Sequence, residues 1–331
     1  MENVFPILEV KGNHRDLGYA IGHRFQKEIQ DRIRSRKENI PNYNEYLKNV
    51  DAYYQITKKY LPEIIEEIET MSEGSGVSIN DLFFHNCREI YNLFINSSEN
   101  DHCTTVVSRN NNSVLVGHNE DWILEGIDDL YVLKATVGKT TILGLANNTL
   151  LPGDVAMANN HGLIQCINEL NSESGLGVPK NFVARAVLDC ENIDEAINLI
   201  KSLPLASGFN HVLVQKEKIV NIEMAASKIS INNIKQNTFV HTNHFLSPEL
   251  KNIETFRSKS SEIRYQKADK LLNNKKHNLN NIFSLLSDTS DNCESICRDE
   301  TIASLVFSPK DKEIWICRGR PDRGKYLKYT F

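Results

Sequence analysis

Apolar residues in the first third of the chain recur with the spacing of amphipathic helices. Asn13 and Asp16 have the spacing of a capping box, in which each side chain binds the backbone N–H of the other residue. The apolar face of the helix that begins there is formed by Leu17, Ala20, Ile21 and Phe25. A short strand is predicted just before this helix, over residues 5–10.

Two more helical stretches are predicted before residue 103. The first covers residues 43–71, is interrupted near Pro62, and is followed by Gly74 and Gly76, which we expect to stop it. The second is capped by Ser78 and extends to about Phe94. The segment 1–102 is therefore expected to be mostly helical.

The pattern changes to a period of two after residue 103, as in β-strands that bury one face. The first two strands are joined at Asn110-Asn111-Asn112, where we expect Asn to supply left-handed backbone angles. Two helices interrupt the strands at 182–189 and 193–203, and two more at about 262–272 and 279–286. Strands are predicted over residues 103–108, 114–119, 130–137, 140–145, 155–159, 163–168, 211–215, 219–224, 302–308, 313–317 and 326–329.

Strands grouped in hairpins, with helices between the groups, predict antiparallel sheets covered by helices. This is the α+β class. The sequence shows no internal repeat, long linker or low-complexity tract, so we expect a single domain.

Composition excludes several classes of function. The 331 residues are 40% hydrophobic and 24% charged, and their net charge of −5 does not favour nucleic-acid binding. The N-terminal sequence lacks the apolar stretch of a secretory signal, and no apolar run approaches the ~20 residues that span a bilayer. These features predict a soluble, cytoplasmic protein without a membrane partner.

Seven cysteines, an odd number, are scattered without a paired framework. This distribution is typical of free thiols in a reducing compartment. Cys293 and Cys297 are four residues apart with no second pair nearby, which is not the spacing of a zinc site.

Cys103 is the strongest candidate for chemistry. It begins a predicted strand directly after a polar segment, 96–101, that reads as an exposed loop. Cleavage between His102 and Cys103 would give Cys103 a free α-amino group next to its thiol. An α-amine titrates near ~7.7–8.0 and a thiol near ~8.5, so the amine can accept the thiol proton at neutral pH. The alternative is that Cys103 is a small buried strand residue, as most free cysteines are.

Two segments carry a resemblance to a known family: Cys103-Thr104-Thr105, and Gly117-His118-Asn119-Glu120-Asp121-Trp122. They are similar to the acyl-coenzyme A:6-aminopenicillanic acid acyltransferase family of N-terminal-nucleophile (Ntn) hydrolases. The resemblance continues in order along nearly the whole chain, in segments 11–22, 177–179 with Arg185, 241–245, Ser260 with Arg264, and 301–304 with Gly319 and Pro321.

The resemblance implies a four-layer αββα sandwich, self-cleavage before Cys103, and an acyl-enzyme on its thiol. Residues 1–102 would become an α chain and residues 103–331 a β chain of one domain. One residue departs from the family pattern: members commonly have a small residue before the nucleophile, whereas this chain has His102. His102 could slow the cleavage, because Gly tolerates a distorted peptide better, or could assist it as an acid or base.

Three further residues complete the candidate site. The amide of Asn243, in a segment that resembles the family, is the candidate donor to the oxyanion of the reaction. Asp121, which the family motif also contains, is a candidate for orienting the terminal ammonium group or for holding a nearby donor. Arg298 could hold Asp121 or a substrate carboxylate through its planar guanidinium, or could be a surface residue paired with Asp299 or Glu300.

Two other functions remain open. His118, His241 and His244, with Asp121, could bind a metal and make the protein a metal-dependent hydrolase. The chain could also be a non-catalytic binding protein with the same fold. The preferred interpretation is a cofactor-free amidohydrolase or acyltransferase that acts on a small acyl amide or an acyl-coenzyme A, in a pocket walled by the loops 121–129 and 151–155.

Overall fold

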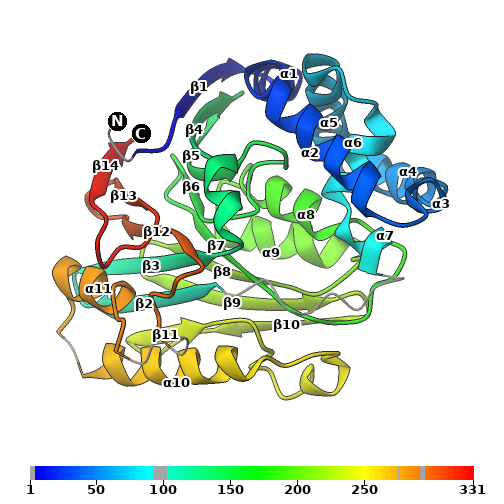
Figure 1. Cartoon of the computed structure of the whole chain (residues 1–331). Coiled ribbons are helices and arrows are strands. Elements are labelled where there is room, and N and C mark those ends of the chain that lie inside the picture. The colour runs from blue at the N-terminus through cyan, green and yellow to red at the C-terminus, as the bar shows by residue number, and fades with distance from the viewer. Residues whose placement is uncertain (1–3, 93–102, 275, 291–294) are drawn as a thin grey trace.

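The computed structural model describes residues 4–92, 103–274, 276–290 and 295–331. Most of the first segment is helical, as predicted (Figure 1). A single strand, β1 (Ile7–Gly12), precedes the helices. The helices are α1 (His14–Arg24), α2 (Gln26–Asn39), α3 (Tyr43–Leu47), α4 (Val50–Tyr60), α5 (Pro62–Ser75), α6 (Ile79–Asn86) and α7 (Arg88–Asn92).

Several predicted helix boundaries are confirmed. Asn13 and Asp16 form the expected capping box of α1. Gly76 ends α5 in the left-handed conformation, with a φ of 70°. Gly74 does not stop α5, because it lies inside the helix, where a Cβ atom would come within 2.5 Å of the Tyr19 carbonyl oxygen of α1. The helix that was predicted from Ser78 to about Phe94 is broken at Cys87, and its expected end at Phe94 lies outside the described residues.

The strands form two sheets. The eight-stranded sheet has the order β1-β4-β5-β6-β7-β8-β9-β10, and the six-stranded sheet the order β11-β2-β3-β12-β13-β14. All of these pairs are antiparallel except β1 with β4, which is parallel. The bounds are β2 (Thr104–Asn110), β3 (Ser113–Asp121), β4 (Leu130–Val137), β5 (Thr140–Asn147), β6 (Met157–Asn159), β7 (Ile164–Glu169), β8 (Phe209–Gln215), β9 (Lys218–Ala225), β10 (Lys228–Asn233), β11 (Thr238–His241), β12 (Thr301–Ser308), β13 (Glu313–Arg318) and β14 (Tyr326–Thr330).

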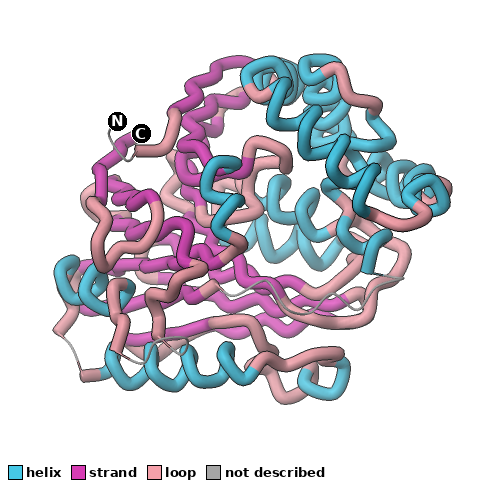
Figure 2. Tube along the Cα trace, viewed as in Figure 1, coloured by secondary structure: helices cyan, strands magenta, loops and turns pink. Residues whose placement is uncertain are grey.

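The two sheets lie face to face and are covered by helices on both outer sides (Figures 1 and 2). The N-terminal helices, with α8 (Lys180–Val187) and α9 (Ile193–Ser202), pack on the eight-stranded sheet. The six-stranded sheet is covered by α10 (Lys259–Asn273) and α11 (Leu279–Leu286). A second apolar core fills the space between the sheets. The α+β class and the four-layer αββα arrangement are therefore confirmed, with β1 as the one parallel strand.

The hairpin between β2 and β3 differs from the prediction in its turn. Left-handed backbone angles at non-glycine residues occur, within the described parts of the chain, at Asn42, Lys216 and Lys312 and not in the Asn110–Asn112 turn. The Asn110 side chain instead accepts hydrogen bonds from the backbone N–H groups of Asn112, at 2.9 Å, and Ser113, at 3.0 Å. Asn thus stabilises this turn through its side chain.

One α-helix and two β-strands of the described residues were not predicted from the sequence. In α2 only Ile29 and Ile33 are buried, so its apolar periodicity is weak. Strand β10 has a single buried residue, and β11 is only four residues long. These strands form because β9 and β2, respectively, offer free edges for pairing.

No helix in the described part of the chain combines the length and apolar character needed to cross a membrane.

Candidate active site

Cys103 lies directly before β2 and is 6% exposed. It lines a cavity of about 200 Å³ between residues of the N-terminal helices and of both sheets. The predicted pocket walls are confirmed, because Trp122, Gly126 and Asp129 of one loop and Asp154 and Val155 of the other line this cavity. Cys103 therefore borders a cavity rather than only apolar packing.

The cavity wall carries charges of both signs. Arg32, Arg36 and Arg88 contribute cations, and Arg88 lies over the ring of Trp122 at 4.9 Å. Burial, with a contribution from the nearby charge of Glu120, raises the pKa of the Asp154 carboxyl group well above its ordinary value. Such a cavity suits a small polar molecule.

Arg264 of α10 connects the candidate residues. Its Nη1 donates to the carbonyl oxygen of Cys103, at 2.7 Å, and to Oγ1 of Thr104, at 2.8 Å. Its Nη2 donates to Oδ1 of Asn243 at 3.0 Å. Burial lowers the pKa of this guanidinium to about 10, so it stays charged at neutral pH. The sequence indicated Arg264 only as part of a family segment and not as a contact of the nucleophile.

Asp121 lies at the end of β3 and is buried. It accepts hydrogen bonds from Oγ1 of Thr301, at 2.6 Å, and from Nε of Arg298, at 3.2 Å. Burial raises the pKa of Asp121, while the charges of Arg298 and Arg264 act in the opposite direction. Arg298 is 6% exposed, so the expected pairing with Asp121 is observed and the alternative of a surface arginine is wrong.

Asn243 follows β11 and is held from two sides. Its backbone N–H donates to Oγ of Ser261 at 2.7 Å, and its Oδ1 accepts from Arg264. Its Nδ2, the atom that would donate to an oxyanion, makes a longer contact of 3.3 Å with the carbonyl oxygen of Glu169. Glu169 also lines the cavity. The geometry thus links Asn243 to Cys103 through Arg264, while its role as oxyanion donor stays a prediction.

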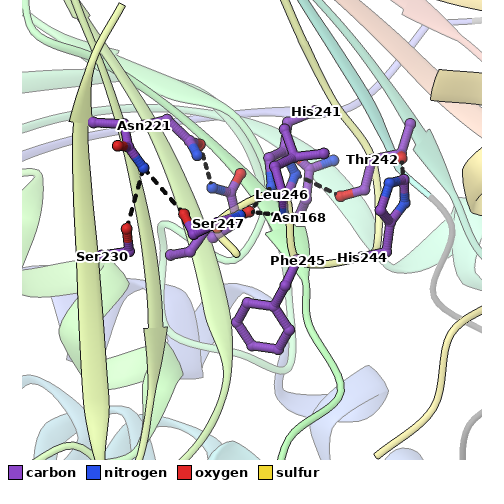
Figure 3. Close-up of polar contacts among 12 residues, drawn as sticks. Asn168, Asn221, Ser230, His241, Thr242, His244, Phe245, Leu246 and Ser247 are labelled. Atoms are coloured by element: carbon purple, nitrogen blue, oxygen red, sulfur yellow. Dashed lines mark hydrogen bonds and ion pairs between the residues drawn. The ribbon is translucent and has the colours of Figure 1, made fainter. Parts of the chain in front are cut away.

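The three histidines considered as metal ligands are not brought together in the part of the chain that the structure describes. Figure 3 shows His241 at the end of β11, and Thr242 and His244 in the segment that follows. His241 contacts Oε1 of Glu223 through Nε2, at 2.8 Å, and His244 contacts Oγ of Ser261 through Nδ1, at 2.8 Å. His118 instead belongs to a group with Cys103 and Glu120, whose potential ligand atoms lie within 4.8 Å of one another.

The segment that carries Asn243 is anchored by Glu223 of β9. This buried carboxylate accepts hydrogen bonds from the backbone N–H groups of Leu246, at 2.7 Å, and Ser247, at 2.8 Å, besides its contact with His241. Although burial acts to raise the pKa of Glu223, these partners lower it to about 2. Glu223 therefore fixes the position of the candidate oxyanion donor.

We expect this carboxylate to make the protein sensitive to acid. Its pKa is lower in the folded than in the unfolded chain, so its stabilisation is complete above about pH 4.5 and is lost as the pH falls towards 2. A shift of this size contributes about 3 kcal/mol. Urea unfolding of wild type and Glu223→Gln at pH 7 and pH 3 tests this, since the difference in free energy of unfolding between the two proteins should shrink at pH 3. An equal difference at both pH values would contradict it.

Glu120 is a site residue that the sequence analysis did not single out. The thiol of Cys103 donates to its Oε2, with an Sγ–Oε2 distance of 3.4 Å. The predicted hairpin could have indicated Glu120. Its register pairs Thr104 with Asn119, and so places residue 120 opposite residue 103. Two residues discussed in the sequence analysis, His102 and Cys293, lie outside the described residues. Cys297 is buried, and its thiol donates to Oδ1 of Asp322 at 3.3 Å.

The sequence profile of a known family, acyl-coenzyme A:6-aminopenicillanic acid acyl-transferase, matches residues 107–323, which is well over half of the chain. The chain belongs to this family. It is also similar to the β-alanyl-dopamine/carcinine hydrolase of Drosophila melanogaster, with 26% identity over 254 residues. That alignment covers 67% of this chain and 65% of the fly protein's own length.

Comparison with solved structures gives distant similarities. An N-acylethanolamine-hydrolyzing acid amidase ortholog of Caenorhabditis elegans matches with a TM-score of 0.48 and 17% identity, over 63% of this chain and 93% of that protein. A mutant form of the conjugated bile acid hydrolase of Clostridium perfringens matches with a TM-score of 0.47 and 11% identity, over 69% and 97% of the two chains.

Proposed function

We propose that the protein hydrolyses an amide, or transfers its acyl group, through an acyl-enzyme on Cys103, after cleavage between His102 and Cys103. One observation carries the proposal: Cys103 stands directly before a strand and lines a cavity, and its carbonyl oxygen is held by the buried Arg264. Charged and polar groups that are fixed around a nucleophile stabilise the charge that develops in the transition state better than water does.

The supporting residues have complementary roles in this proposal. After cleavage, the α-amine of Cys103 accepts the thiol proton and later returns it to the leaving amine. Asp121, held by Arg298 and Thr301, orients the ammonium form of that amine. Asn243 turns its Nδ2 from the carbonyl of Glu169 to the oxyanion. The proposed division into chains 1–102 and 103–331 follows from the same cleavage.

The substrate that we propose is a small acylated amine or an acyl thioester such as an acyl-coenzyme A. The size of the cavity supports a small acyl group, and its charged wall supports a polar one. The fly relative is named for hydrolysis of β-alanyl-dopamine and carcinine, so amides of this kind are the first compounds to test.

The test is to trap the acyl-enzyme by mass. Purified protein is mixed with β-alanyl-dopamine, carcinine, N-acyl amines, N-acyl amino acids and acyl-coenzyme A esters, and is then denatured with acid. We expect a mass increase equal to the acyl group on the peptide that contains Cys103. Protein that cleaves itself but gives neither an adduct nor turnover, and that cuts denatured protein at defined sites, would show a peptidase instead.

Added amine acceptors then separate hydrolysis from transfer. A transferase diverts the acyl group to a new amide in proportion to the amine, whereas a hydrolase releases the free acid regardless. A chain that stays intact, with an unreactive Cys103 and no turnover of any compound, would be the non-catalytic binding protein.

A further inference from the structure

A chain of hydrogen bonds leads from the β2–β3 hairpin to the Cys103 thiol. Thr105 and His118 are directly paired across the hairpin, and Thr105 Oγ1 lies 2.9 Å from His118 Nδ1. His118 Nε2 lies 3.1 Å from Glu120 Oε2, the oxygen that also accepts from Cys103 Sγ. Alternate residues of a strand share one face, so the spacing of Cys103 and Thr105, and of His118 and Glu120, brings these four groups together.

The Thr105 end of this series of hydrogen bonds determines which nitrogen of His118 carries the proton. Thr105 Oγ1 donates its single proton to Oδ1 of Asn168, at 2.8 Å. The same oxygen must then accept from His118, so the proton of the imidazole is on Nδ1. Burial lowers the pKa of His118 to about 4, so no second proton is bound at neutral pH when the ring is considered alone.

This arrangement leaves a place for one proton. With Nδ1 protonated, His118 Nε2 and the carboxylate oxygen of Glu120 are both acceptors, yet they lie 3.1 Å apart. Two acceptors at hydrogen-bond distance repel each other unless a proton lies between them. The thiol of Cys103 already donates to the same carboxylate oxygen, at 3.4 Å, and can supply that proton.

We propose that Glu120 and His118 together are the base that deprotonates Cys103 in the uncleaved chain, and so start self-cleavage. The inference rests on the proposed function, in which Cys103 is the nucleophile. It supplies what the terminal-amine mechanism lacks, because before cleavage the nitrogen of Cys103 is in a peptide bond and is not basic. Two different bases then serve the same thiol, one before cleavage and one after it.

The reaction balances with these groups alone. The thiol proton moves to the Glu120–His118 pair, and the thiolate attacks the carbonyl carbon of the bond between residues 102 and 103. The carbon–nitrogen bond then breaks, and the stored proton passes to the departing nitrogen of Cys103. This gives a thioester and a free amine, and water hydrolyses the thioester to a carboxylate and the regenerated thiol.

Several other charged groups near the thiol have contacts of their own. Arg264 of α10 contacts the carbonyl oxygen of Cys103, and Asp121 is occupied by Arg298 and Thr301. Lys180 of α8 and Glu169 of β7 form an ion pair with each other. The remaining titratable or charged groups of the cavity wall are Arg32 and Arg36 of α2, His85 of α6, Arg88 of α7, and Asp129 and Asp154 of the loops.

The experiment compares wild type, Glu120→Gln and a control, Glu217→Gln, which removes an exposed carboxylate on the β8–β9 turn. Each chain is made in a cell-free system with a chelator present, so that no metal occupies the Cys103–His118–Glu120 group. Denaturing mass analysis follows cleavage before Cys103 with time. We expect Glu120→Gln to cleave about 10²- to 10⁴-fold more slowly, the usual range for loss of a general base, and Glu217→Gln to cleave at the wild-type rate.

A second measurement separates loss of the base from damage to the fold. Alkylation of Cys103 by iodoacetamide is followed on uncleaved chains from pH 6 to pH 10. The pH midpoint should be higher in Glu120→Gln than in wild type, while the rates converge at high pH, where hydroxide deprotonates the thiol in both. Thr105→Val, which removes the hydroxyl that sets the His118 proton, should move the midpoint in the same direction by a smaller amount.

The outcomes distinguish this inference from the proposed function. If wild type does not cleave, and Cys103 forms no acyl-enzyme, the proposed function fails. If wild type cleaves and Glu120→Gln cleaves equally fast with an unchanged alkylation midpoint, only the Glu120–His118 base is refuted. Slower cleavage with a reduced alkylation rate at every pH would also refute it, since that result indicates a distorted site.

Discussion

Replacing Cys103 with alanine is expected to give a single uncleaved chain with no measurable turnover. The change removes the thiol of a residue that lines the cavity, while the methyl group still fits the space at the start of β2. Loss of a catalytic nucleophile commonly lowers turnover by about 10⁴-fold or more. Denaturing mass analysis should show two chains for wild type, the lighter ending at His102, and one chain for Cys103→Ala.

The matched control is Cys166→Ala, which removes another buried thiol from the strand β7. Burial raises the pKa of Cys166 well above the ordinary value, so this thiol is not expected to react. Cys166→Ala should cleave and turn over substrate, with a loss confined to stability. A wild-type enzyme that is active and wholly intact would refute the terminal-amine mechanism and leave Cys103 as an ordinary thiol at most.

Replacing Asn243 with alanine is expected to lower turnover by about 10²- to 10³-fold without preventing folding. The lost group is the amide Nδ2, whose contact among the described residues is the 3.3 Å one with the carbonyl oxygen of Glu169, and which we expect to turn to the oxyanion. Measured kcat should fall much more than KM rises, because the hydrogen bond forms chiefly in the transition state.

Arg264 also loses a contact in this variant, so its folding must be checked. Asn243→Asp keeps an oxygen for Arg264 and removes the N–H donor. It should lose turnover as Asn243→Ala does, and its circular dichroism spectrum checks that the fold is kept. Wild-type turnover in Asn243→Asp would show that another group stabilises the oxyanion.

Much of the fold could be predicted because local patterns agree with the tertiary structure. The strand 130–137 and the helix 279–286 occur with the predicted bounds, since each has a complete apolar face and clear turn residues at its ends. The parallel pairing of β1 with β4 could not be predicted, because more than a hundred residues separate these strands and nothing in either strand specifies its partner. The weak strand β11 likewise depends on the edge of β2.

The candidate site also has residues that could be selected from the sequence and contacts that could not be predicted from it. Cys103, Asp121, Asn243 and Arg298 could be selected from residue types and family motifs, and the structure confirms the contact between Arg298 and Asp121. The central position of Arg264 could not be derived, because its contact with Cys103 joins residues 161 positions apart. The grouping of three histidines around a metal was wrong for a related reason, since spacing along the chain does not show which partner each imidazole has.

By itself, the sequence determined the α+β class, the hairpin that begins at Cys103, and the membership of a family with an N-terminal nucleophile. These follow from period, turn residues and local motifs, which act over a few residues. Only the tertiary structure decided that Arg264 connects Cys103 to Asn243. Such contacts depend on how sheets and helices pack, and packing is set by the whole core rather than by any one segment.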